Sequence, residues 1–372
     1  MIQTGRIVLK KINLNVPINS LGYGVVGYNI WKHLRDKVDT TLWCIPNESQ
    51  IIPPVDIGST DVPQKISNDI NKQNIFYAES PCLKIWHENQ LAHRIGKGPM
   101  FSWPFFEVSK FDERRKSNLE SSDHIIVSSD WAKKVCLENL YFGEDRIHVV
   151  PCGVDREIFH EADNNNFKTN SCVFFNCGKW EIRKGHDILH NAFKDAFSEK
   201  DNVELWMMTE NPFLKEQEVK SWQKLYKHPK IKMINRVQYQ HQLVEIIKQT
   251  YCGVFPSRAE GWNLEALEMM ACGKEVIITN YSAHTQFCNE DNSRLINISE
   301  EEPIYDGKWF VGENGMWASL EGDAYDQLVN HLRQVYEQWK TNRSNNVNGI
   351  QTSKQFSWNY SVEQLDKIIF GG

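Results

Sequence analysis

The sequence has no long apolar run. Nowhere do 18 or more apolar residues follow one another, which argues against a membrane-spanning helix. Residues 1–17 also lack the apolar centre of a secretory signal, and we read them as leading into a first strand. A basic stretch at 110–116 alternates with acids, as in a solvated helix. We therefore expect at most peripheral contact with a membrane.

Basic residues are not gathered in any one part of the chain. The 42 lysines and arginines are scattered, and the formal net charge is −6. A protein that binds phosphate backbones usually presents a basic face or stripe. We therefore expect no nucleic-acid partner.

Paired cysteines and metal-type spacings are also missing. The nine cysteines include no C-x-x-C pair and no spacing typical of a zinc site. Several, such as Cys172, Cys177, Cys252 and Cys272, lie inside apolar runs, where a reduced cysteine behaves as a small hydrophobe. We predict structural thiols, a cytoplasmic location and no bound metal.

Strand-like apolar runs alternate with amphipathic stretches along the whole chain. Its 372 residues suggest about two domains of ordinary size. The alternation predicts an α/β fold with parallel sheets covered by helices on both faces. The predicted strands are 6–14, 41–45, 74–78, 83–86, 124–128 and 148–150, then 171–177, 203–208, 231–235, 251–255 and 276–279. The clearest early helices are 24–35 and 131–139.

A polar break at 161–170, without periodicity, is typical of a linker. It separates two similar α/β halves. Ligands of such sheets bind at the carboxyl ends of the strands, so two facing domains form a cleft between them.

The segment 254–273 is the most informative part of the chain. A strand ends at Phe255, a loop follows, and a helix begins near Asn263, which can cap it. The helical stripe consists of three apolar residues and one carboxylate, Glu268. A buried carboxylate needs partners or a ligand, and a ribose diol offers two donors.

Glu260 lies in the loop before this helix, at the carboxyl end of a strand. Free backbone N–H groups at Gly261, Trp262, Asn263 and Leu264 favour an anion such as a diphosphate. Surface solvation with partial capping is the alternative reading of both glutamates.

A second segment, 174–189, runs from a buried strand into a glycine turn. Lys179, Arg183 and Lys184 follow the turn and precede Gly185 and a helix. Cations at this position suit a departing diphosphate. A solvated charged turn is the alternative.

These motifs resemble family 4, the group 1 type, of the retaining glycosyltransferases. The family's glycine, basic residue and Lys-Gly pair are matched by Gly178, Lys179 and 184–185, and its two glutamates with seven residues between them by Glu260 and Glu268. The stretch 145–159 resembles its interdomain hinge and 356–365 its closing helix. The resemblance covers most of the chain from about Ile125, and the motifs occur in the family's order.

The resemblance implies a GT-B fold, two Rossmann-like doubly wound parallel-sheet domains facing across a cleft. We expect an acceptor-side domain at 1–155, a nucleotide-sugar domain at 156–350 and a returning C-terminal helix at 351–372. It also implies that Lys179 and Lys184 contact the donor diphosphate, and we count the neighbouring Arg183 among the donor-binding candidates. Glu260 is implied to hold the donor sugar, and Glu268 the ribose.

The first domain is less distinctive. Gly22, Gly24 and Gly27 match G-x-G-x-x-G, but an intervening loop and a missing acidic residue argue against a nicotinamide cofactor. The resemblance instead implies a glycine loop near the donor phosphates, with a plain helix-entry loop as the alternative. His87, His93 and Glu107, the last at the end of a strand-like run, are candidates for the acceptor side.

We therefore predict a retaining hexosyl transfer from a UDP- or GDP-sugar to a hydroxyl of an unidentified carbohydrate or glycolipid. No D-x-D triplet is present, and metal-dependent transferases of the other common fold use one. No cofactor is expected, because the nucleotide-sugar is a substrate. The alternatives are a sugar-nucleotide epimerase or phosphorylase on the same fold, and a non-catalytic nucleotide-sugar-binding protein.

Overall fold

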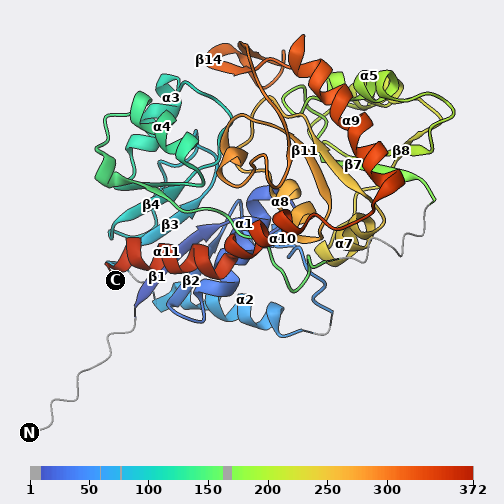
Figure 1. Ribbon diagram of the computed structural model, residues 1–372. Coiled ribbons are helices and arrows are strands. Elements are labelled where there is room, and N and C mark those ends of the chain that lie inside the picture. Colours follow the sequence, from blue (N-terminus) through green and yellow to red (C-terminus); the bar gives the residue numbers. More distant parts are fainter. Residues whose placement is uncertain (1–9, 59, 76–77, 162–169, 372) are drawn as a thin grey trace, which may run out of the picture.

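A computed structural model describes residues 10–58, 60–75, 78–161 and 170–371. Two six-stranded parallel sheets, each flanked by helices, form the two halves of the molecule (Figure 1). The strands predicted from the apolar runs belong to these sheets, with one exception at 74–78. Residues 74 and 75 belong to a 3₁₀ turn, Lys72–Ile75, and 76–77 lie outside the described residues.

The first sheet has the order β2-β1-β3-β4-β5-β6. Its strands are β1 (Lys11–Val16), β2 (Asp39–Cys44), β3 (Cys82–Ile85), β4 (Met100–Trp103), β5 (His124–Val127) and β6 (Ile147–Val149). Its helices are α1 (Gly22–Leu34), α2 (Val62–Asn71), α3 (Glu113–Glu120) and α4 (Asp130–Asn139). Of the predicted first strand, residues 6–9 lie outside the described residues.

The second sheet has the order β12-β11-β10-β7-β8-β9. Its strands are β7 (Cys172–Gly178), β8 (Val203–Thr209), β9 (Ile231–Met233), β10 (Cys252–Phe255), β11 (Glu275–Thr279) and β12 (Arg294–Ile296). Helices α5 (His186–Ala196), α6 (Glu216–Leu225), α7 (Gln240–Lys248), α8 (Leu264–Ala271) and α9 (Asp323–Thr341) accompany it, with a hairpin of β13 (Glu301–Tyr305) and β14 (Val311–Ala318). Most of the predicted linker, 162–169, lies outside the described residues.

Each sheet reverses its winding once. The reversal lies between β1 and β3 in the first sheet and between β7 and β10 in the second. In doubly wound sheets the loops diverge at this point, which opens a crevice at the carboxyl ends of the two strands. The topology therefore marks one crevice in each half.

The end of the chain returns to the first half. After α10 (Val347–Gln355), helix α11 (Trp358–Phe370) lies along α1 (Figure 1). Trp358, Val362 and Leu365 are buried in this contact. The chain passes between the halves twice, near Val154 and near Phe356. These two segments are adjacent, because Val154 donates its N–H to the carbonyl of Phe356 (3.0 Å). Helix α11 thus completes the covering of the first sheet.

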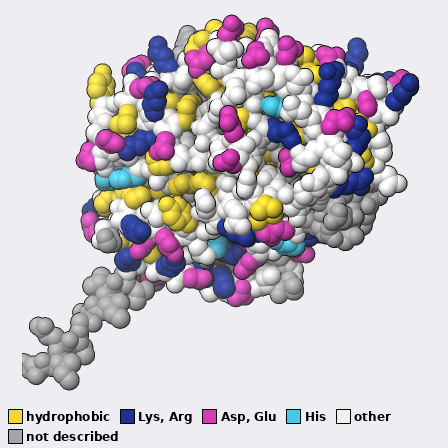
Figure 2. Space-filling view, in the orientation of Figure 1, with side chains coloured by type: hydrophobic (Ala, Val, Ile, Leu, Met, Phe, Trp, Pro, Cys, Tyr) yellow, Lys and Arg dark blue, Asp and Glu magenta, His cyan; other side chains and the backbone are white. Residues whose placement is uncertain are grey.

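The nine cysteines are free thiols, as predicted, and all but the partly exposed Cys44 are buried. Basic and acidic side chains are interspersed over the face shown in Figure 2. Among the described residues, no helix combines the length and hydrophobicity needed to cross a bilayer.

Candidate functional site

The loop after β7 and the loop after β10 meet at the reversal point of the second sheet. Gly185 directly precedes α5 and has a left-handed backbone (φ +70°), and a Cβ there would lie 2.1 Å from the carbonyl oxygen of Pro256. Only glycine permits both the conformation and the close approach. Gly185 thus brings the basic loop 179–184 against the loop that carries Glu260.

Arg183, Lys184 and Glu260 form a buried ionic cluster between these loops. Arg183 Nη1 donates to Glu260 Oε2 (2.8 Å), and Lys184 Nζ donates to Glu260 Oε1 (2.9 Å). Ser257 Oγ donates to the same Oε1 (2.8 Å), and the Glu260 N–H donates to Ser282 Oγ (2.8 Å). The predicted sugar-binding glutamate and two predicted phosphate-binding cations are therefore in direct contact.

The charges of this cluster stabilise one another. Burial alone would raise the pKa of Glu260, but Arg183 and Lys184 hold it well below its usual range. Burial would lower the pKa of Lys184, yet the carboxylates of Glu260 and Glu265 raise it. Glu260 is therefore a permanent carboxylate, and Lys184 a permanent ammonium, at physiological pH.

Lys179 lies outside the buried cluster. Its side chain is 38% exposed, and its Nζ is 3.7 Å from Glu181 Oε1. The ammonium also lies 5.6 Å from the centre of the Phe213 ring. Glu181 meanwhile binds Arg183 Nη2 (2.7 Å). Lys179 is thus the cation of the three that moves most freely toward a ligand.

The residues before α8 form the seam between the two halves. Asn263 has a left-handed backbone (φ +80°), and its Oδ1 accepts the Ala266 N–H (3.2 Å), which confirms the predicted cap. The Gly261 carbonyl accepts from Ser128 Oγ (2.6 Å), and a Cβ on Gly261 would lie 3.0 Å from Phe105. The first N–H groups of α8 lack intrahelical acceptors by geometry.

The side chains in this seam are mostly structural. Trp262 is buried against the rings of Phe287 (4.9 Å between centroids) and Phe356 (5.8 Å). Leu264 packs against the same core. Any contact of Gly261, Trp262 and Leu264 with a donor would therefore come from their backbone.

Glu268 is buried on the inward face of α8. Burial and the nearby charge of Glu265 raise its pKa well above the usual value, and a hydrogen bond with Gln240 opposes the rise. No cation pairs with it among the described residues. This uncompensated carboxyl is compatible with hydroxyl donors from a ligand.

Glu107 reaches the cluster from the first half. Its Oε1 lies 3.8 Å from Arg183 Nη2. Burial raises the pKa of Glu107 to about 7, with Arg183 opposing and Glu260 adding to the rise. The prediction that Glu107 ends a strand is wrong, because β4 stops at Trp103, before Pro104. Glu107 instead sits in the irregular loop that follows.

Tyr23 lies between His87 and the loop that carries Glu107. Tyr23 donates its hydroxyl to the Phe105 carbonyl (2.8 Å), and its ring lies 4.5 Å from that of His87. Burial lowers the pKa of His87; Glu88 opposes this effect, and the charge of Lys179 in the other half adds to it. His87 therefore faces the same site, whereas His93 lines a separate cavity described below.

The glycine motif forms the first turn of α1, which begins at Gly22. A Cβ on Gly24 would lie 2.2 Å from Asn19 Oδ1, whereas one on Gly22 would meet no atom within 4 Å. Gly24 is therefore required for packing, and Gly22 faces open space. The tyrosine between them is the site residue that sequence reasoning missed, together with Glu181, Ser257 and Ser282. An aromatic residue flanked by two glycines was the available signal for Tyr23.

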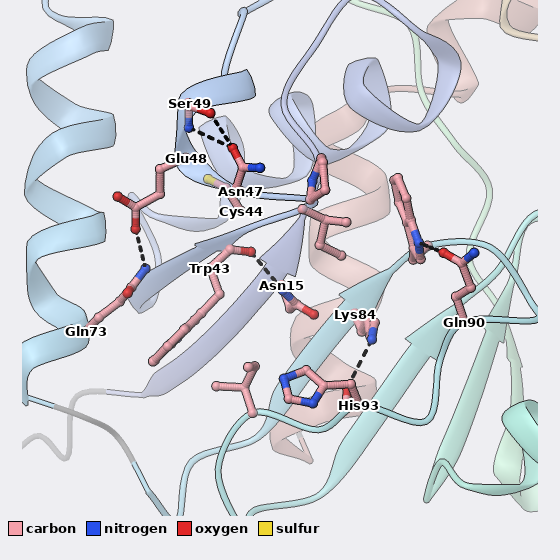
Figure 3. Close-up of a pocket in the computed structure, with 14 residues that line it drawn as sticks. Asn15, Trp43, Cys44, Asn47, Glu48, Ser49, Gln73, Lys84, Gln90 and His93 are labelled. Atoms are coloured by element: carbon pink, nitrogen blue, oxygen red, sulfur yellow. Dashed lines mark hydrogen bonds between the residues drawn. The ribbon is translucent and has the colours of Figure 1, made fainter. Parts of the chain in front are cut away.

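A cavity of about 700 Å³ opens at the other reversal point, beside β1, β2 and β3 (Figure 3). Asn15, Trp43, Lys84 and Trp86 are among its lining residues. Trp86 also contacts the rings of Tyr23 (5.7 Å) and His87 (5.0 Å). The cavity therefore adjoins the first-half side of the cluster. Within the described ranges, no three or more His, Cys, Asp or Glu residues gather as metal ligands would.

Comparison with known proteins points to the same family as the sequence motifs. Residues 171–306 match the family described as "Glycosyl transferases group 1". An uncharacterised glycosyltransferase of Methanocaldococcus jannaschii is 27% identical over 235 residues, which cover 59% of this chain and 60% of the relative's length. Residues 171–306, which match the family, contain all the cationic and carboxylate groups of the second half described above.

Solved structures share the fold over nearly the whole chain. HepE of Anabaena, in complex with UDP and glucose, has a TM-score of 0.71 at 13% identity, covering 98% of this chain and all of that one. Sucrose-phosphate synthase of Thermosynechococcus elongatus has a TM-score of 0.67 at 15% identity, covering 96% and 98%. Residues 171–306 thus resemble the group 1 glycosyltransferases, and the chain, with two doubly wound parallel sheets, has the GT-B fold.

Proposed function

We propose that the chain is a retaining glycosyltransferase that moves a hexosyl group from a nucleoside diphosphate sugar to an acceptor hydroxyl. The observation that carries this proposal is the buried cluster of Arg183, Lys184 and Glu260 at the reversal point of the second sheet. HepE, a structural neighbour, binds UDP-glucose. A UDP- or GDP-sugar is accordingly the proposed donor.

The donor diphosphate is proposed to bind beside Lys179 and Lys184 and the first turn of α8. Two or more cations offset the charge that develops on the departing diphosphate. The dipole of α8 adds to this effect. Lys184 is fixed by Glu260, while exposed Lys179 can move onto the phosphates. The chain thus supplies the positive charge that a metal ion supplies elsewhere.

The rest of the donor is proposed to contact the two glutamates. Glu268, buried and without a cation, would accept hydrogen bonds from the ribose diol. Glu260, fixed as a carboxylate, would accept from hydroxyls of the transferred sugar. Both side chains lie in or just before α8, so one structural unit would position the nucleotide and the sugar.

In the proposed reaction the acceptor oxygen attacks the anomeric carbon from the face that the diphosphate leaves. The new C–O bond forms as the bond to the phosphate oxygen breaks, and the acceptor proton passes to that phosphate oxygen. Anomeric configuration is therefore retained. Stabilisation of the leaving diphosphate is the largest catalytic effect, worth several kcal/mol over the cations. Glu107 and His87 would orient the acceptor hydroxyl from the first half.

A nucleotide screen tests the donor site without knowledge of the acceptor. The full chain is titrated with UDP-, GDP- and ADP-sugars in a thermal-shift assay, beside Glu268→Ala and a surface control, Glu290→Ala. A ligand at 100 times its dissociation constant adds about 2.7 kcal/mol. We expect one base to stabilise wild type and the control but not Glu268→Ala. A chain that none of the three stabilises would contradict the proposal.

Transfer itself is tested with the base found in that screen. The chain is incubated with the matching sugar nucleotide and a panel of carbohydrates, and the product is examined by NMR. We expect a new glycosidic bond with the anomeric configuration of the donor. Inversion at the anomeric carbon, or an altered sugar nucleotide without transfer, would reject the proposed reaction.

A further inference from the structure

The cavity beside β1, β2 and β3 contains a buried cation. Lys84, on β3, is only 4% exposed, and it is paired in register with Asn15 of β1. Residues paired across parallel strands point to the same face of the sheet. Figure 3 shows both side chains lining the cavity at the reversal point of the first sheet.

The ammonium of Lys84 has few partners. Its Nζ donates to the carbonyl oxygen of His93 (3.0 Å), and no carboxylate lies within ion-pair distance of it among the described residues. An ammonium has three donors, and one carbonyl satisfies one of them. Burial lowers the pKa of Lys84, and the neighbouring thiol of Cys82, not a carboxylate, is what opposes this effect. Buried charges in proteins are normally paired, so this one calls for an anion from outside the chain.

The cavity's own carboxylate does not supply that anion. Glu48 accepts a hydrogen bond from Gln73 Nε2 (3.4 Å), and Figure 3 shows the two on the side of the cavity away from Lys84. The remaining lining is suited to a sugar. Trp43 and Trp86 line it together with the amides of Asn47 and Gln90, and aromatic rings and amides are side chains that recognise sugars.

We propose that this cavity binds the acceptor, and that the acceptor carries an anionic group, a carboxylate or a phosphate, which pairs with Lys84. The inference rests on the proposed function, because it assigns the bound molecule the role of acceptor. Trp86 supports that role, since it lines the cavity and contacts His87. An anion held at Lys84 would anchor one end of the acceptor while a hydroxyl extends past Trp86 toward the cluster.

The test compares charged and neutral sugars on the full chain. Sodium glucuronate, glucose 6-phosphate and glucose are titrated by ligand-observed NMR at constant ionic strength. The variants are Lys84→Met, which removes the charge at similar length, and Lys84→Arg, which keeps it. Lys97→Met is the matched control, because Lys97 is exposed and lies outside the cavity lining.

We expect at least one anionic sugar to bind wild type about 10- to 100-fold more tightly than glucose, as a charged hydrogen bond allows. Lys84→Met should lose this preference, Lys84→Arg should keep part of it, and Lys97→Met should keep all of it. Preference for glucuronate identifies a carboxylate acceptor, and preference for glucose 6-phosphate a phosphorylated one. Equal binding of the three sugars, absence of binding, or a preference that survives in Lys84→Met overturns the proposal.

A nucleotide control separates this inference from the proposed function. Stabilisation of Lys84→Met by the sugar nucleotide that stabilises wild type shows that the variant is folded with its donor site intact. If no sugar nucleotide stabilises wild type, the glycosyltransferase proposal fails, whatever the anion titration shows. If sugar nucleotides stabilise the chain and the anion preference is missing, only the assignment of Lys84 fails.

Discussion

The guanidinium of Arg183 lies 3.8 Å from the carboxylate of Glu107, and this pair links the two halves of the molecule. Arg183 also binds Glu260 (2.8 Å) within its own half. One arginine therefore stands between a carboxylate from each sheet. The loop after β4 and the loop after β7 therefore meet at this arginine.

Glu260 is expected to serve both stability and catalysis. Glu260→Ala leaves Arg183 and Lys184 buried without their main partner, which typically costs about 3–5 kcal/mol. Glu260→Gln keeps the shape and an acceptor oxygen and should remain folded. Its turnover should nevertheless fall by about 10²–10³-fold, because the neutral amide alters the charge around the leaving group. Chemical denaturation and steady-state kinetics measure the two effects separately.

The surface variant Glu290→Ala is the control for both measurements and should match wild type. Wild-type turnover in Glu260→Gln would remove Glu260 from the catalytic site.

The two lysines of the basic loop should behave differently. Lys179→Met removes an exposed cation and should leave the free energy of unfolding within about 0.5 kcal/mol of wild type. Lys184→Met removes a buried partner of Glu260 and should destabilise the fold. Both should weaken turnover. Equal thermal stability of the two variants would show that Lys184 is not a structural partner of Glu260.

Protonation of Glu107 should make stability depend on pH. Its pKa is raised to about 7 in the folded chain, above the ordinary value of 4.5, so the folded state holds a proton that the unfolded state releases. Stability should therefore fall as pH rises from about 5 to 7, by on the order of 1–3 kcal/mol. Denaturant unfolding of wild type and Glu107→Gln across this range measures the effect.

The difference between the stability curves of wild type and Glu107→Gln isolates the contribution of the Glu107 carboxyl, because the buried histidines titrate alike in both chains. Parallel curves would place the pKa of Glu107 near its ordinary value.

Two glycines provide a matched test of the backbone. Gly185→Ala places a Cβ 2.1 Å from the Pro256 carbonyl at φ +70°, and it should cost at least about 1–3 kcal/mol. Gly22→Ala meets open space at a helix start, and it should be neutral or slightly stabilising. Thermal unfolding decides the comparison. A stable Gly185→Ala chain would show that the two loops can separate without loss.

The sequence predicted the site residues of the second half in more detail than those of the first, although it missed β12 and the β13–β14 hairpin. Around Glu260, local signals are sufficient, since the strand end at Phe255, the cap at Asn263 and the helical stripe all lie within one segment. Glu107 lies near Arg183 only because the two halves pack against each other, and no local sequence pattern predicts such a long-range contact. Strand β4 escaped prediction because four residues between Pro99 and Pro104 are too few to show periodicity. The acidic partner Glu181 was overlooked among its basic neighbours.

The return of α11 to α1 also has a consequence for biosynthesis. Trp358, Val362 and Leu365 fill a surface formed by residues translated more than 300 positions earlier. Domains usually fold in order as they leave the ribosome. Here the half that emerges first leaves the apolar surface beneath α11 uncovered until α11 has been synthesised. A nascent chain stalled before Trp358 should therefore recruit chaperones even though the first sheet is already synthesised, and docking of α11 should end that association.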